Sequence, residues 1–164
     1  KNIILALDLL ENVTLHLAGP IYDSKFEAEL RALPGWKKVK FYGYTDRGTV
    51  DEIFNKSKAA LVTFLPVPNH IDAQPNKLFE YMSAGIPVIG SEFELWKEII
   101  IGNDCGICIN PEAPEEIADA VRYLLSNPEK AQEMGKNGLK AVEKFYNWET
   151  ESKKLINSYN ELFS

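Results

Sequence analysis

Residues 59–92 read AALVTFLPVPNHIDAQPNKLFEYMSAGIPVIGSE, and this stretch decides the fold class. Its first part, 59–65, is an unbroken apolar run that predicts a strand buried on both faces. A helix is expected next, because apolar residues recur at helical spacing between Pro75, at its first position, and Gly85, just past its end. Residues 88–89 predict a second buried strand. Strand, helix and strand make a βαβ unit, in which the two strands run parallel.

The same alternation continues on both sides of this stretch. Further strands are expected at residues 13–18, 39–42 and 106–109, and further helices at 3–10, 23–33, 46–56, 93–100, 114–125, 128–146 and from 147 onward. Strands that alternate with helices, each strand an apolar run, indicate a parallel sheet covered on both faces. The sequence therefore predicts an α/β fold: a Rossmann-like, doubly wound parallel sheet.

The length of 164 residues fits one domain over 1–164. Five strands are expected within it. Because the chain opens on a helix that a βαβ unit would place after a strand, we expect a sixth strand upstream of Lys1. The start also lacks an initiator Met, so we interpret the chain as a piece of a longer protein.

Composition excludes several classes of function. The chain has 24 acidic and 18 basic side chains, a net charge of −6 and a pI near 5.0, which argues against nucleic acid as a partner. Its apolar runs are much shorter than the ~20 residues that span a bilayer. A lone pair of cysteines, Cys105 and Cys108, fits a reducing compartment, so we expect a cytoplasmic protein. One pair supplies only two of the four ligands of a structural zinc site, so a buried structural role is expected and no metal site.

Candidate functional residues lie in and after the proline-rich loop at 66–75. In open parallel sheets, ligands bind beyond the carboxyl ends of the strands, where helix N-termini attract anions. Asp72 lies in this loop and Glu80 eight positions later in the following helix. Two interpretations stay open: both carboxylates contact a ligand, or Asp72 or Asn76 caps the helix while Glu80 is solvated. His70, beside them, either contacts the ligand or is solvated.

The segment resembles the donor-binding segment of GT-B glycosyltransferases of the group 1 (family 4) type. That family shows an acidic residue, seven intervening positions and a Glu, here Asp72 and Glu80. A helix ending in Ala-Gly-x-Pro-Val follows, here residues 84–88. The resemblance extends over essentially the whole chain and implies the C-terminal half of a GT-B fold.

The resemblance implies a site for a nucleotide-diphosphate sugar, used as the donor substrate without a cofactor. Glu80 would hold ribose hydroxyls and Asp72 would face the donor sugar, so these two are the expected catalytic residues. The diphosphate would rest on the helix amides, with Lys77 as a cation. The substrate-binding set implied in this way is Tyr44 (at the base), His70, Gln74, Asn76, Lys77, Leu78 and Glu80. On the residues alone, Tyr44 fits a packing role as well.

The chain departs from the family in three respects. Its first acid is Asp72 where Glu is commoner, and residues 73–76 replace a glycine-rich stretch. The family's diphosphate-binding Arg and Lys lie near the first strand, upstream of this chain. The acceptor site belongs to an N-terminal domain that the chain lacks, so alone it is expected to bind donor and transfer little.

The function implied is metal-independent, retaining glycosyl transfer in polysaccharide or glycolipid biosynthesis. The missing N-terminal domain is the expected partner, and any peripheral membrane association would come through it. In this family the last helix crosses toward that domain, so Trp148 or Phe163 is expected to be exposed. Two alternatives remain: a GT-B type sugar-nucleotide epimerase, and a non-catalytic nucleotide-binding or protein-interaction module that kept the fold.

Overall fold

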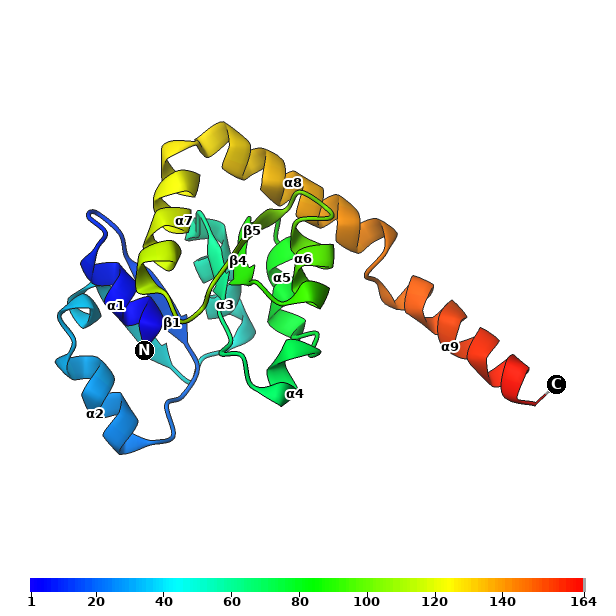
Figure 1. Ribbon diagram of the computed structural model, residues 1–164, viewed down its shortest axis with the longest axis horizontal. Coiled ribbons are helices and arrows are strands. Elements are labelled where there is room, and N and C mark those ends of the chain that lie inside the picture. The colour runs from blue at the N-terminus through cyan, green and yellow to red at the C-terminus, as the bar shows by residue number, and fades with distance from the viewer. Residues whose placement is uncertain (164) are drawn as a thin grey trace.

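The computed structural model describes residues 1–163 and confirms the alternation of strands and helices (Figure 1). Its strands are β1 (Leu15–Ala18), β2 (Val39–Gly43), β3 (Ala60–Val62), β4 (Val88–Ser91) and β5 (Gly106–Ile109). Its α-helices are α1 (Asn2–Asp8), α2 (Ser24–Ala32), α3 (Arg47–Lys56), α4 (Pro68–Ile71), α5 (Asn76–Ser83), α6 (Glu94–Ile100), α7 (Pro114–Ser126), α8 (Pro128–Lys144) and α9 (Trp148–Leu162). The short 3₁₀ helix η1 (Pro34–Lys38) and α4 are additions that the sequence analysis did not predict.

All five expected strands are present, and every pair that forms is parallel. Within the described residues they make two sheets, β1-β2 and β3-β4-β5, because no strand there joins β1 to β3. The strand expected at 59–65 is shorter than predicted, since β3 covers only Ala60–Val62. The apolar residues after it belong to the loop that leads to α4.

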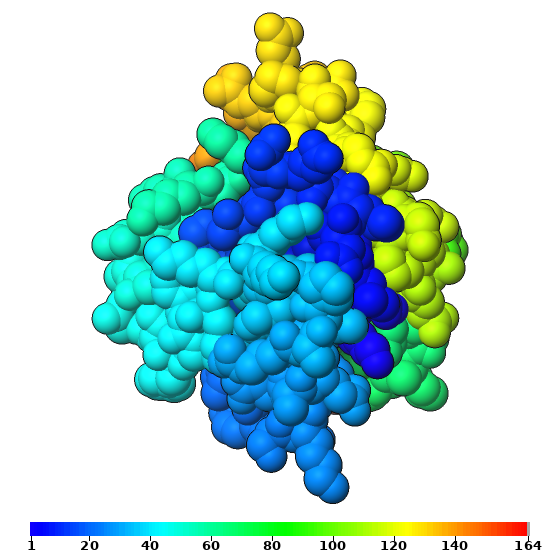
Figure 2. All heavy atoms as spheres, turned by 90° about the vertical axis from the view of Figure 1, so that its left-hand side faces the viewer, coloured from blue at the N-terminus to red at the C-terminus, as the bar shows by residue number. Residues whose placement is uncertain are grey.

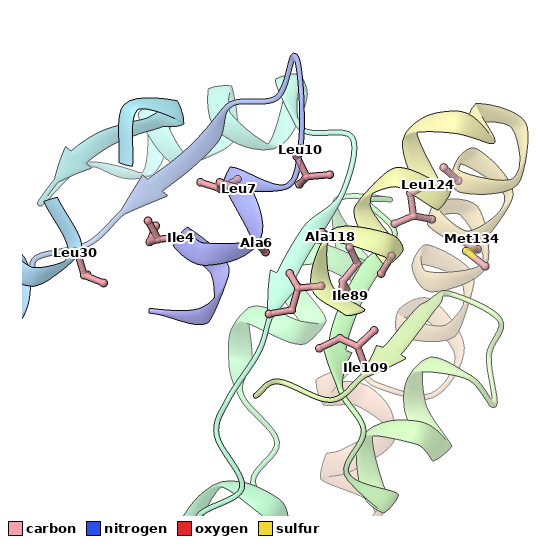
Figure 3. Packing of buried hydrophobic residues seen from close by; sticks show 13 residues of the cluster. Ile4, Ala6, Leu7, Leu10, Leu30, Ile89, Ile109, Ala118, Leu124 and Met134 are labelled. Carbon is pink, nitrogen blue, oxygen red and sulfur yellow. The ribbon is translucent and has the colours of Figure 1, made fainter. Parts of the chain in front are cut away.

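Two apolar clusters cover opposite faces of the sheet β3-β4-β5, and the first also packs against β1 and β2. The first packs Ile4 and Leu7 of α1 with Ile89 of β4 and Leu124 of α7 (Figure 3). The helix α1 lies between η1 and α7, as the dark blue segment in Figure 2 shows. The second cluster surrounds Trp96 of α6, which is fully buried with residues of β3, β4, α5 and α8. Burial of these apolar side chains is the main favourable contribution to the free energy that holds the strands and helices together.

Several helix ends follow from single residues. Asp23 caps α2 by accepting hydrogen bonds from the amides of Lys25 and Phe26 at 2.9 and 3.1 Å. Gly85 ends α5 with φ +68°, a conformation that favours glycine. Pro75 lies one position earlier than expected, at the N-cap of α5 and not at its first residue.

The last helix, α9, extends away from the body of the domain (Figure 1). None of its residues is buried, and Trp148 and Phe163, which follows it, are 74% and 84% exposed. The expected exposure of these two side chains is confirmed. No helix among residues 1–163 is both long enough and apolar enough to cross a membrane.

Candidate functional site

The loop between β3 and α5 is fixed at two points beyond the carboxyl end of the sheet. The Nε1–H of buried Trp96 donates a hydrogen bond to the carbonyl oxygen of Ala73 at 2.7 Å. The hydroxyl of Ser91, at the end of β4, donates to the carbonyl oxygen of Phe64, also at 2.7 Å. Because both donors belong to packed elements, the loop that carries Asp72 has a defined path.

The Phe64 ring is the centre of this region. It packs against His70 and Trp96, with ring centroids 4.8 and 5.5 Å apart, and the ammonium of Lys77 lies 4.7 Å above its centroid. Burial of that ammonium lowers the pKa of Lys77 from its usual value. The Nδ1–H of His70 donates a hydrogen bond to the carbonyl oxygen of Leu65 at 3.0 Å.

The N-terminus of α5 has amides that no side chain caps within the described chain. The first intrahelical bond runs from the amide of Leu78 to the carbonyl of Pro75, so the amides of Asn76 and Lys77 have no intrahelical partner. The alternative in which Asp72 or Asn76 caps this helix is therefore wrong. Asp72 lies at the C-cap of α4 and is exposed. An uncapped helix start of this kind favours anions.

Glu80 is paired with a residue of α3. The Nη1 of Arg47 lies 3.3 Å from the Oε1 of Glu80, and its Nε lies 3.1 Å from Asp51. The Arg47 and Glu80 side chains are 64% and 46% exposed, so a ligand can reach both. Both interpretations of Glu80, as a ligand contact and as a solvated carboxylate, stay open, since its side chain is exposed as well as ion-paired.

Two cavities meet at Glu80. One, of about 620 Å³, lies between α3, α5 and the end of α8, and is lined by Arg47, Asn76, Glu80 and Tyr146, among others. The other, of about 720 Å³, lies between β1 and β3 and is lined at one end by Lys77 and Glu80. Of the residues predicted from sequence, Glu80 lines both cavities, Asn76 the first and Lys77 the second.

The remaining predicted residues are more dispersed. Tyr44 follows β2 and is 90% exposed, and Gln74 is exposed in the loop. Leu78 is fully buried in the second apolar cluster, so its side chain packs α5 against its neighbours. Sequence reasoning missed Arg47, Phe64 and Trp96, since nothing in their local patterns distinguishes them from surface and core residues.

The two cysteines belong to the same apolar cluster as Phe64 and Trp96, but they line neither of the two cavities. Cys105 is buried and its thiol lies 3.4 Å from the carbonyl oxygen of Ile100, while Cys108 is partly buried in β5. Burial raises the pKa of these thiols to about 11 and about 12. No group of three or more His, Cys, Asp or Glu side chains that could hold a metal ion occurs among residues 1–163.

Known proteins share this fold. The C-terminal domain of a group 1 family glycosyl transferase, LpcC of Francisella tularensis, superposes with a TM-score of 0.71 at 21% identity, over 90% of this chain and 76% of that one. Anabaena Alr3699/HepE, solved in complex with UDP, gives a TM-score of 0.83 at 17% identity, over 98% and 44%. The D-rhamnosyltransferase WbpZ of Pseudomonas aeruginosa is 29% identical over 147 residues, which are 84% of this chain and 36% of WbpZ.

The fold and these likenesses define the class: an α/β domain of the kind that forms the C-terminal half of GT-B glycosyltransferases. The chain belongs to the family described as Glycosyl transferases group 1, which it matches over residues 1–141. It spans little more than a third of the length of WbpZ, at 36%.

Proposed function

We propose that this chain is the donor-binding domain of a glycosyltransferase and binds a nucleotide-diphosphate sugar. The observation that carries the proposal is the position of Glu80, which lies in the second turn of α5 and lines both cavities. Membership of the group 1 family supports it, as does the complex of the similarly folded HepE with UDP. The reaction proposed is metal-independent, retaining transfer in polysaccharide or glycolipid biosynthesis.

Glu80 is assigned to the ribose of the nucleotide. An ionised carboxylate only accepts hydrogen bonds, so its two oxygens suit two vicinal hydroxyls, and such charge-assisted bonds are roughly twice as strong as neutral ones. The pair with Arg47 uses one oxygen, Oε1, at 3.3 Å. Ribose binding therefore needs a small shift of an exposed pair and no rearrangement of the core.

The diphosphate is assigned to the start of α5. The open amides of Asn76 and Lys77 supply donors, and the Lys77 ammonium, held over Phe64 at 4.7 Å, supplies a positive charge. When the bond between the sugar and the diphosphate breaks, the diphosphate leaves with the electron pair. Donors that are already in place stabilise the growing negative charge without reorganisation.

Asp72 is assigned to the donor sugar, because it lies in the loop between β3 and α5, just before the helix start to which the diphosphate is assigned. A hydrogen bond from Trp96 to the carbonyl of Ala73 holds this loop in place. His70 and Gln74 share that loop, and Tyr44, exposed after β2, is assigned to the base. The acceptor substrate would be bound by a second domain of a longer protein. That domain is the partner proposed for this chain.

The experiment is a calorimetric titration of the full-length protein with UDP, GDP, ADP and CDP, with and without magnesium, and then with the matching nucleotide-sugars. Selective binding of one nucleotide that is independent of magnesium supports the donor site. Asp72→Ala is expected to leave the affinity for the free nucleotide unchanged and to lower the affinity for the nucleotide-sugar. Binding of none of the four nucleotides would favour the non-catalytic interaction module, and epimerised free sugar in place of transferred sugar would favour the epimerase.

A further inference from the structure

Arg47 is the first residue of α3, and its guanidinium group reaches carboxylates on two different helices. Its Nε lies 3.1 Å from Oδ1 of Asp51, one turn further along α3, and its Nη1 lies 3.3 Å from Oε1 of Glu80 on α5. The contact with Asp51 uses the i, i+4 spacing that brings side chains together on one helix face. Arg47 is therefore tied to its own helix by one contact and joined to the proposed ribose-binding carboxylate by the other.

An aromatic ring of α3 also supports the guanidinium group. The Cζ of Arg47 lies 5.9 Å from the centroid of the Phe54 ring, a distance within the range of cation–π contacts. Phe54 in turn meets the ring of Tyr81 edge-on, with centroids 5.5 Å apart, and so packs α3 against α5. The head group of Arg47 therefore has support from Asp51 and Phe54, both on its own helix, where it meets Glu80.

The contact between Arg47 and Glu80 is the only hydrogen bond or ion pair that joins side chains of α3 and α5 within residues 1–163. Without it, the Glu80 side chain, which is 46% exposed, would have no partner among these residues to select one of its rotamers. Glutamate is among the residues that lose most rotamer freedom when they are held in one conformation. The ion pair therefore orients the Glu80 carboxylate before a ligand arrives.

The ion pair can persist when a ribose binds. An ionised carboxylate has about four lone-pair sites on its two oxygens, and Arg47 occupies one of them on Oε1 of Glu80. No group within residues 1–163 donates a hydrogen bond to Oε2. Enough acceptor positions therefore remain for two vicinal hydroxyls. The guanidinium also offsets the charge of a carboxylate that a bound ribose would partly shield from water.

We propose that Arg47 is a positioning residue, which orients the Glu80 carboxylate for the ribose of the nucleotide. The inference rests on the proposed function, because that function assigns Glu80 to the ribose. Arg47 acts through Glu80 and makes no contact of its own with the nucleotide. It therefore contributes to the selection of ribonucleotides over 2′-deoxyribonucleotides, which lack one of the two hydroxyls that Glu80 would accept.

The test is calorimetric titration of the full-length protein with the nucleoside diphosphate that it selects and with the 2′-deoxy form of that diphosphate. In Arg47→Ala, the affinity for the ribonucleotide is expected to fall about 2- to 10-fold, because ordering one flexible side chain on binding costs this much. The affinity for the 2′-deoxy form is expected to fall less, so the ratio of the two affinities decreases. Unchanged or higher affinity for the ribonucleotide would overturn the inference, as would an unchanged ratio.

A double substitution shows whether Arg47 acts through Glu80. Addition of Arg47→Ala to Glu80→Ala is expected to cause no further loss of affinity, because the carboxylate that Arg47 orients is already absent. A further loss in the double variant would mean that Arg47 contacts the nucleotide directly, and it would overturn the inference.

Arg31→Ala is the matched control. Arg31 of α2 pairs with Glu27 at 2.7 Å with the same i, i+4 spacing and lies 4.9 Å from the ring centroid of Trp36, but it lines neither cavity. Its substitution is expected to leave both affinities unchanged. Equal losses in Arg31→Ala and Arg47→Ala would show a general effect of removing an arginine and would overturn the inference.

Failure of the inference can be told apart from failure of the proposed function. If the unsubstituted protein binds no nucleoside diphosphate, or if Glu80→Ala leaves the affinity unchanged, the proposed donor site is wrong and the inference falls with it. If Glu80→Ala lowers the affinity and Arg47→Ala does not, the donor site stands and only the positioning role of Arg47 is wrong.

Discussion

Replacement of Glu80 tests the proposed donor site most directly. Glu80→Ala removes the carboxylate that we assign to two ribose hydroxyls, and loss of two charge-assisted hydrogen bonds costs about 1–3 kcal/mol. At ~1.4 kcal/mol for each factor of ten, nucleotide affinity should fall about 5- to 150-fold. The measurement is calorimetric titration of the full-length protein with the nucleotide that it selects.

The same substitution should leave the fold intact. The side chains of the Arg47–Glu80 pair are 64% and 46% exposed, and an exposed pair contributes at most about 1 kcal/mol. Glu52→Ala is the matched control: Glu52 has a comparable exposed pair with Lys56 at 3.4 Å and lines neither cavity. Unchanged affinity in Glu80→Ala, or an equal loss in Glu52→Ala, would refute the assignment.

Three further predictions concern the scaffold. Trp96→Phe keeps a six-membered aromatic ring but removes the indole N–H, which leaves the carbonyl of Ala73 without its donor, and it leaves a space in the core. The free energy of unfolding, measured in urea, should therefore fall by about 1–3 kcal/mol or more. Gly135→Ala should destabilise by about 1–3 kcal/mol or more, because its methyl group would collide with backbone at the end of α5; Gly48→Ala, where the nearest atom is 3.5 Å away, should not. Since the pKa of Cys108 is raised to about 12, its thiol should react with a disulfide reagent at pH 8 only after unfolding; rapid reaction of the folded protein would contradict this.

Local pattern was enough to place most elements of the fold. The helix over α5 and the strand at β4 were predicted because apolar spacing, Gly85 and Pro87 act within a few residues of one another. The short helix α4 escaped notice because its four residues, Pro68–Ile71, lie in a stretch whose prolines favour a loop. The two separate sheets were also not predicted, since strand pairing joins residues far apart in sequence.

The candidate site could be predicted only in part, because several of its contacts join residues that are far apart in sequence. Spacing placed Glu80 on a helix that follows a strand, but its partner Arg47 comes from α3, 33 positions earlier. The path of the Asp72 loop depends on Trp96, which lies 23 positions after the carbonyl it binds. Contacts of this kind arise only when packed elements meet, so no local pattern signals them.

The net charge of the whole chain says little about the electrostatic potential at a small site within it. A charge of −6 argues against binding a long polyanion, because such binding depends on a field over a wide surface. A diphosphate needs only donors within a few ångströms. In the proposed site, the uncapped amides of α5 and the ammonium of Lys77, 4.7 Å above the Phe64 centroid, would supply these donors. An acidic domain and an anionic substrate are therefore compatible, because the helix start and one cation set the potential where the diphosphate would bind.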